Sequence, residues 1–185
     1  THKFAEYLGK TVKELNPEET EVFEFDPVLN RSEKINSLPK VVLVMQPQSQ
    51  MEEMGYNDLI YGWDLNHYVP SFVNPNEILD GAIISGSFMP ASSKWSTYDM
   101  QNFPIIKELY KEHGKSLNFL GVILSNLNVS LEQKERSAIF VANLAKALGA
   151  DGAIVTEEGY GNPDTDLMMN CRKVERKGVK VVLIT

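Results

Sequence analysis

Residues 119–155 read FLGVILSNLNVSLEQKERSAIFVANLAKALGADGAIV, and this stretch predicts a strand, a helix and a second strand. Its two ends are continuous apolar runs, which are typical of parallel strands covered by helices on both faces. Between them, Ser130 and Gln133 have the spacing of a capping box, and Gly149 is placed to end the helix that they begin. This order of elements predicts an α/β fold, because parallel neighbours need a crossover connection, usually a helix.

The same alternation continues along the chain. Further apolar runs with strand character occupy residues 41–45, 82–84 and 179–184. Helices are predicted at 104–113 and from a cap at Asp164 or Thr165 to Lys177. The sequence therefore predicts a single α/β domain over residues 1–185, with a mainly parallel sheet flanked by helices, as a fragment of a longer polypeptide.

Residues 46–103 interrupt this pattern. They hold nine of the chain's seventeen aromatic residues in under a third of its length, and they follow no regular strand or helix period. We therefore predict an irregular, aromatic-rich insertion beside the sheet.

The composition excludes several classes of protein. A formal net charge of -7 argues against a nucleic-acid partner, because phosphate binding needs clustered Lys and Arg. No run approaches the roughly 18 apolar residues of a membrane helix, and no signal peptide is visible. The single cysteine fits a reducing compartment, so we expect a cytoplasmic protein. The three histidines lack metal-ligand spacing, so we expect no metal site.

Small and polar residues follow three of the predicted strands. If these strands are parallel, their carboxyl ends meet at one edge, where open α/β sheets bind ligands. The candidate substrate-binding residues at this edge are Ser85, Ser87, Asn126 and Asn162. The candidates for general base or carbonyl polarisation are Glu157, Glu158, Asp164 and Thr165. A solvated turn with a helix cap explains the acidic loop without any chemistry.

This loop leads to Asn170-Cys171, which holds the only cysteine of the chain. A thiol that directly follows a peptide carbonyl can attack it and convert the amide into a thioester. That step begins a self-cleavage that can leave a carbonyl cofactor on the chain itself. Core packing is the alternative role for a lone cysteine.

The segment that ends at this cysteine resembles one family. The distinctive runs are GADGAIV at 149–155, EEGYGNPDTDL at 157–167, MNC at 169–171 and LDGAIISG at 79–86. They resemble the proprotein of the alpha and beta subunits of component B in the glycine, sarcosine and betaine reductase complexes. The D-proline reductase proprotein is a cousin of this family.

The resemblance implies cleavage between Asn170 and Cys171, with Cys171 becoming an N-terminal pyruvoyl group. It implies that this ketone condenses with a small amino-acid substrate in a reductive C–N cleavage. The implied partners are the selenocysteine-containing subunit of component B and the carrier selenoprotein of the complex. The fragment alone is expected to be inactive, since it contains no selenocysteine.

Betaine raises a separate question, because it has no N–H and cannot form a Schiff base. An aromatic cage for its quaternary ammonium has Trp63 and Trp95 as first candidates, and packing or a subunit interface is the alternative for both. For the whole chain, two alternatives stay open. One is a non-catalytic ligand-binding or scaffold domain of the same complex with the Asn170-Cys171 bond intact. The other is a plain α/β domain with a structural cysteine.

Overall fold

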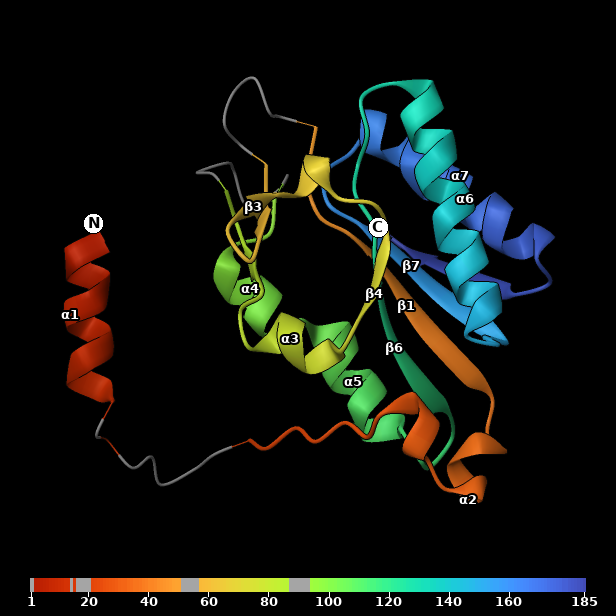
Figure 1. The fold of residues 1–185 in the computed structure, drawn as a ribbon, viewed down its shortest axis with the longest axis horizontal. Helices are drawn as coiled ribbons and strands as arrows, with labels where there is room; N and C mark the ends of the chain where they lie inside the picture. Colours follow the sequence, from red (N-terminus) through yellow and green to blue (C-terminus); the bar gives the residue numbers. More distant parts are fainter. Residues whose placement is uncertain (1, 14, 16–20, 51–56, 87–93) are drawn as a thin grey trace.

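The computed structural model describes residues 2–13, 15, 21–50, 57–86 and 94–185, and it is built on a five-stranded sheet with the order β4-β6-β1-β7-β8 (Figure 1). The strands are β1 (Lys40–Gln46), β4 (Ser71–Val73), β6 (Asn118–Leu124), β7 (Gly152–Glu157) and β8 (Lys180–Ile184). β1 pairs in parallel with β6 and β7, and β7 pairs in parallel with β8. The edge strand β4 is antiparallel to β6. The predicted α/β fold with a mainly parallel sheet is confirmed.

Helices cover both faces of this sheet (Figure 1). One face carries α6 (Leu131–Ala147) and α7 (Asn162–Arg176). The other carries α3 (Pro75–Leu79), α4 (Thr97–Gln101) and α5 (Pro104–Glu112). Shorter turns are η1 (Val28–Asn30), α2 (Glu33–Asn36) and η3 (Leu65–His67), while α1 (His2–Val12) stands apart from the sheet (Figure 1).

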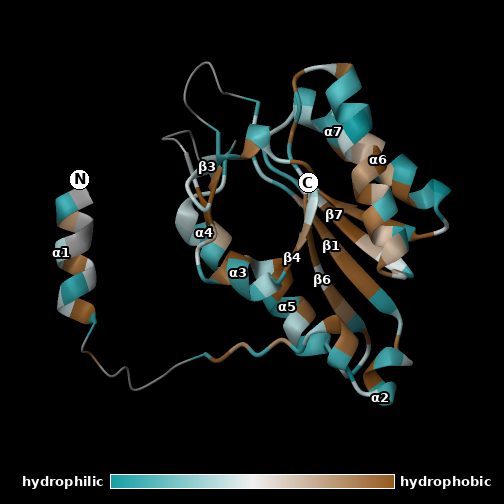
Figure 2. Cartoon of the chain, viewed as in Figure 1, coloured by the Kyte–Doolittle hydropathy of each residue, from teal (hydrophilic) through white to brown (hydrophobic). Residues whose placement is uncertain are grey.

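The two layers of helices give the molecule two apolar cores. Successive residues of β1 divide between them, because side chains alternate across a strand. Val42 and Val44 face the α6–α7 core, whereas Leu43 and Met45 face the core under α5, and all four are fully buried. Burial on both faces explains why β1 is a continuous apolar run. Figure 2 shows these hydrophobic strands between helices with hydrophilic outer faces.

The two long helices begin for different local reasons. α6 starts at the predicted capping box, in which the Ser130 hydroxyl accepts from the Gln133 N–H. α7 starts at Asn162, earlier than the predicted caps at Asp164 or Thr165. The reason is that the Asp164 carboxylate accepts from the Gly161 N–H at 2.9 Å, so Asp164 serves from inside the first turn. The cap prediction was therefore wrong.

The predicted insertion contains regular structure. A small antiparallel sheet has the order β3-β2-β5 and consists of β2 (Leu59–Ile60), β3 (Trp63–Asp64) and β5 (Ile83–Ile84). The expectation that residues 82–84 join the parallel sheet was wrong, because Ile83 and Ile84 pair with β2 in the smaller sheet, where Ile84 stays exposed. β4 belongs to the same insertion but extends the main sheet through β6.

Gly121 explains how β4 can lie against β6. The β1–β6 register shifts beside this residue, and Gly121 has a φ of +140°, which favours glycine. A Cβ at this position would lie 2.6 Å from the Phe72 ring of β4. A residue without a side chain therefore lets the insertion close over this edge of the sheet.

Candidate functional site

The Asn170-Cys171 peptide bond lies in the interior of α7, on the side that faces the sheet. Asn170 is 1% exposed and Cys171 is 5% exposed. Cys171 packs in the α6–α7 core with Val155 of β7 and Val174 of α7. In a helix, each carbonyl accepts from the N–H four residues later, so the bond is held in a regular hydrogen-bonded turn.

The side chain of Asn170 is fixed by Gln46, the last residue of β1. The Asn170 Nδ2 donates to Gln46 Oε1 at 2.5 Å, and the Gln46 Nε2 donates to the Thr156 carbonyl at 3.2 Å. The Asn170 Oδ1 is buried and has no hydrogen-bond partner. The strand end of β1 thus orients one side of the residue whose carbonyl a thiol would attack.

The thiol of Cys171 is not activated by its surroundings. Burial raises its pKa to about 11, and the charges of Glu175 and Glu157 add to the effect. The thiol therefore stays protonated near neutral pH, and attack on a carbonyl requires a base that takes its proton.

Glu157 is a buried carboxyl whose charge acts on the Cys171 thiol. It ends β7, is 6% exposed, and meets no N–H or hydroxyl donor at either carboxyl oxygen. Burial is the largest cause that raises its pKa to about 8, and the nearby carboxyl of Asp164 acts in the same direction. The pKa of Asp164 is lowered, so Glu157 holds the proton while Asp164 is ionised. Glu157 thus changes protonation state near neutral pH, as a general base must.

Glu158 points away from this pair and joins a second acidic cluster. Its carboxyl accepts from the Gln48 N–H at 2.7 Å and from the Trp95 N–H. Burial and the nearby carboxyl of Asp58 raise the pKa of Glu158 to about 9. The ion pair between Asp58 and Lys94 is fully buried beside it. This cluster ties the insertion to the strand ends, which favours a structural role for Glu158.

The loop after β5 reaches the same edge through Asp58. The Gly86 N–H donates to Asp58 Oδ1 at 3.2 Å, and a Cβ at Gly86 would lie 1.5 Å from the Asn57 carbonyl oxygen. The Ser85 N–H donates to the Thr97 hydroxyl. Ser85 therefore lies near the strand ends although β5 belongs to the smaller sheet. Ser87 lies outside the described residues.

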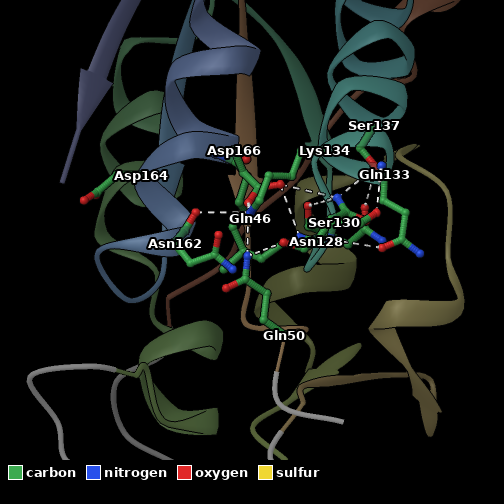
Figure 3. Close-up of polar contacts among 12 residues, drawn as sticks. Gln46, Gln50, Asn128, Ser130, Gln133, Lys134, Ser137, Asn162, Asp164 and Asp166 are labelled. Atoms are coloured by element: carbon green, nitrogen blue, oxygen red, sulfur yellow. Dashed lines mark hydrogen bonds and ion pairs between the residues drawn. The ribbon is translucent and has the colours of Figure 1, made fainter.

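A buried polar network holds the first turns of α6 and α7 together (Figure 3). At its centre, Lys134 of α6 forms an ion pair with Asp166 of α7 and donates to the Asn162 carbonyl at 3.1 Å. Asp166 also accepts from Asn128 and from Gln50, at 3.2 and 3.1 Å. In Figure 3, Asn162 lies beside Lys134, whereas Asp164 points away from the network. The network is a clamp that positions α7 against the strand ends.

The side chain of Asn126 is held by hydrogen bonds next to the same clamp. Its Oδ1 accepts from the Ser137 hydroxyl at 3.0 Å, and its Nδ2 donates to the Tyr68 carbonyl at 3.1 Å. This amide is satisfied within the protein. Of the other predicted residues, Asn162 and Thr165 are exposed at the start of α7.

A cavity of about 500 Å³ lies between the ends of β7 and β8 and the α4–α5 segment. Its lining includes Trp95, Tyr98, Phe103, Thr156, Glu157 and Ile184. Trp95 and Phe103 meet edge to face, with ring centroids 4.9 Å apart. Trp63 does not line this cavity and is 69% exposed on β3, so the two tryptophans have different surroundings. Glu157 lines this cavity, and its charge is also one of the causes of the raised pKa of Cys171.

Gln46, Lys134 and Asp166 were not among the predicted site residues. The usable signal for Gln46 is a polar residue directly after the apolar run of β1. No sequence signal points to Lys134, because a lysine in a helix is normally solvated, whereas this one is 3% exposed.

Among the residues that the structure describes, no group of three or more His, Cys, Asp or Glu side chains could hold a metal ion. No helix in the described ranges is long and apolar enough to cross a membrane.

Fold and site together define an α/β domain with a buried Asn-Cys bond in a helix and a buried carboxyl of raised pKa at the end of a strand. A model of the family "Glycine/sarcosine/betaine reductase component B subunits" matches residues 1–185, and the chain belongs to this family. It is 66% identical over 184 residues to the betaine reductase complex component B subunit alpha of Peptoclostridium acidaminophilum. It is 48% identical over 183 residues to the sarcosine reductase counterpart from the same organism.

More distant relatives extend the comparison. The glycine reductase complex component B subunits alpha and beta of Acetoanaerobium sticklandii are 43% identical over 183 residues. A D-proline reductase proprotein of that organism is 25% identical over 118 residues, or 62% of this chain and 18% of its own length. This chain is matched over 99–100% of its length by the first three relatives but spans only 42% of theirs. No solved structure matches it.

Proposed function

We propose that this chain is the cleavage-site region of a component B proprotein, which cuts itself between Asn170 and Cys171 to make a pyruvoyl cofactor. The observation that carries the proposal is the position of Cys171 directly after the Asn170 carbonyl, and the charge of Glu157 acts on its thiol. Membership of the component B family supports it.

The cleavage needs no external oxidant or reductant. The Cys171 sulfur bonds to the Asn170 carbonyl carbon, the peptide C–N bond breaks, and the thiol proton ends on the Cys171 nitrogen. Loss of the Cα proton and of the C–S bond gives a thiocarboxylic acid on Asn170 and a dehydroalanine at the new N-terminus. Its imine tautomer takes up one water and releases one ammonia, which leaves the ketone.

Glu157 acts as the general base in this scheme. Its ionised form takes the proton of the Cys171 thiol when the two groups come within hydrogen-bond reach. Asp164 stays ionised and helps to raise the pKa of Glu157. Because α7 is regular at Asn170, this turn must open before sulfur reaches the carbonyl carbon.

After cleavage, the ketone is the site that receives the substrate amine as a Schiff base. The cavity beside Glu157 is the proposed substrate chamber, and its aromatic wall at Trp95 suits an ammonium group through cation–π contact. We further propose a selenocysteine-containing subunit of component B and the carrier selenoprotein as partners, acting in the cytoplasm on glycine, sarcosine or betaine.

One measurement tests the proposal on the full-length protein. The denatured mass is determined with and without a carbonyl-reactive hydrazine, for the unmodified chain and for Cys171→Ala. We expect two pieces, of which the C-terminal one gains the hydrazine adduct, and an uncut Cys171→Ala chain. Scission of Cys171→Ala at the same bond in this otherwise unchanged chain contradicts the thiol mechanism.

A second function is favoured by one observation, the burial of the bond within a regular helix. In that case the chain is a ligand-binding or scaffold domain of the complex, and the bond stays intact. A single mass with a free thiol, after addition of the partner subunit, supports this alternative.

A further inference from the structure

Asn170 carries a nucleophile of its own beside the bond that is proposed to break. Its Nδ2 can attack its own main-chain carbonyl, because this closes a five-membered succinimide. The Nδ2–C bond forms, the Asn170-Cys171 C–N bond breaks, and a proton moves from Nδ2 to the Cys171 nitrogen. The C-terminal piece then begins with an ordinary cysteine. No ketone is made, so this route destroys the precursor without giving a cofactor.

Gln46 holds this competing group on β1. The Asn170 Nδ2 donates to Gln46 Oε1 at 2.5 Å. Gln46 cannot reverse its own amide without loss, because its Nε2 donates to the Thr156 carbonyl at 3.2 Å. Gln46 is 0% exposed and Asn170 is 1% exposed, so water does not compete for either amide. The Thr156 carbonyl of β7 therefore fixes the orientation of the Gln46 amide, and Gln46 in turn fixes the orientation of the Asn170 side chain.

The unpartnered Asn170 Oδ1 shows how strongly Gln46 sets this direction. A buried acceptor without a donor costs free energy. Reversing the amide of Asn170 would not remove the cost, because it would place Oδ1 against Gln46 Oε1. The side chain thus keeps an unsatisfied oxygen and a satisfied nitrogen, which is the arrangement that restrains the nucleophile.

We propose that Gln46 is a positioning residue that keeps the Asn170 amide away from its own carbonyl, so that the Cys171 thiol is the group that attacks. The proposal rests on the proposed function for the thiol route. The restraint that Gln46 places on the amide route can be measured even in a chain that lacks the thiol.

The test compares Gln46→Met with Gln46→Glu in the full-length protein. Met has a similar length but makes neither hydrogen bond. A buried, protonated Glu keeps an oxygen acceptor for Asn170 and an O–H donor for Thr156. Mass spectrometry of the pieces separates the two routes, since the amide route gives a C-terminal succinimide and an intact N-terminal cysteine. We expect the amide-route fraction to rise about tenfold or more in Gln46→Met and to stay low in Gln46→Glu.

Gln50→Met is the matched control. Gln50 donates to the Asn128 carbonyl at 2.6 Å and to Asp166 at the same edge, but it does not bond Asn170. Its product ratio is expected to equal that of the unmodified chain. An unchanged ratio in folded Gln46→Met, or an equal rise in Gln50→Met, overturns the proposal. Circular dichroism identifies unfolded variants, and Gln46→Asn, whose amide is one carbon short, replaces Gln46→Met if that variant does not fold.

A Cys171→Ala background separates this proposal from the proposed function. In that background, adding Gln46→Met is expected to open slow amide-route cleavage, while Cys171→Ala alone stays uncut. If the unmodified chain never forms a ketone, but Cys171→Ala is cleaved only when Gln46→Met is added, the proposed function fails and the role of Gln46 stands. If the ketone forms, but Gln46→Met raises amide-route cleavage neither in the unmodified chain nor in Cys171→Ala, the proposed function stands and the role of Gln46 fails.

Discussion

The carboxyl of Glu157 acts on the thiol of Cys171 across the end of β7 and the middle of α7. Its charge is one of the causes, after burial and the charge of Glu175, that raise the thiol pKa to about 11. Burial and Asp164 in turn raise the pKa of Glu157 to about 8. An acid that titrates near neutral pH therefore acts electrostatically on a thiol that does not.

Self-cleavage is expected to accelerate between pH 6 and 9, because the base form of Glu157 is populated as pH rises through about 8. Glu157→Gln removes this base and should slow cleavage by about 100-fold. In that variant the rate should keep rising toward the thiol pKa of about 11. Timed mass spectra at several pH values measure both profiles. Identical profiles for the two proteins exclude Glu157 as the base.

Glu157 also predicts a pH dependence of folding that needs no catalysis. Its pKa is raised from 4.5 to about 8, so the folded state binds more protons than the unfolded state between these values. Stability contributed by this group is therefore lost as pH rises from about 4.5 to 8, and the loss is complete above 8. Glu157→Gln should be more stabilising at pH 8.5 than at pH 5 in urea unfolding. Glu158→Gln is a useful comparison, since its profile should extend to about pH 9.

The sequence was informative where a local pattern determined the structure. The capping residues around α6 and the apolar strand runs allowed the helix and the parallel sheet to be predicted, because each pattern involves residues that are close together in the chain. The contact between Gln46 and Asn170 joins residues 124 positions apart, and no local pattern reports such a pair. The burial of Lys134 depends in the same way on Asp166, which another helix supplies. Asn170-Cys171 was found because its chemistry needs only adjacent residues.

Trp95 and Trp63 are expected to differ in substrate binding. Trp95 lines the cavity beside Glu157, whereas Trp63 lies on β3 outside its lining. Trp95→Leu should weaken binding of a quaternary ammonium probe such as tetramethylammonium about 3- to 30-fold, in line with a buried cation–π contact. Trp63→Leu serves as the control and should change it little. Titration calorimetry on the Cys171→Ala chain gives both affinities, and an equal loss in both variants would argue against this cavity.

Gly121→Ala is expected to destabilise the fold by about 1–3 kcal/mol. The φ of +140° disfavours any side chain, and the new Cβ would lie 2.6 Å from the Phe72 ring. Gly152→Ala on β7 is the control, because its Cβ would meet its nearest atoms at 3.8 Å and at an ordinary φ. Urea unfolding compares the two. If both variants lose the same stability, close packing of β4 on Gly121 is not what constrains this position.

Removing one partner of the buried Lys134–Asp166 pair is expected to cost about 3–5 kcal/mol, because the other charge is left buried and unpaired. Lys134→Met should show this cost, and adding Asp166→Leu should recover part of it, since no buried charge then remains. The pair Lys173–Glu135 also joins α6 and α7 but is 24% and 57% exposed, so Lys173→Met should cost at most about 1 kcal/mol. Urea unfolding of the three variants and the unmodified chain measures these differences. A cost for Lys134→Met no larger than that for Lys173→Met would mean that the clamp at the first turn of α7 does not depend on its ion pair.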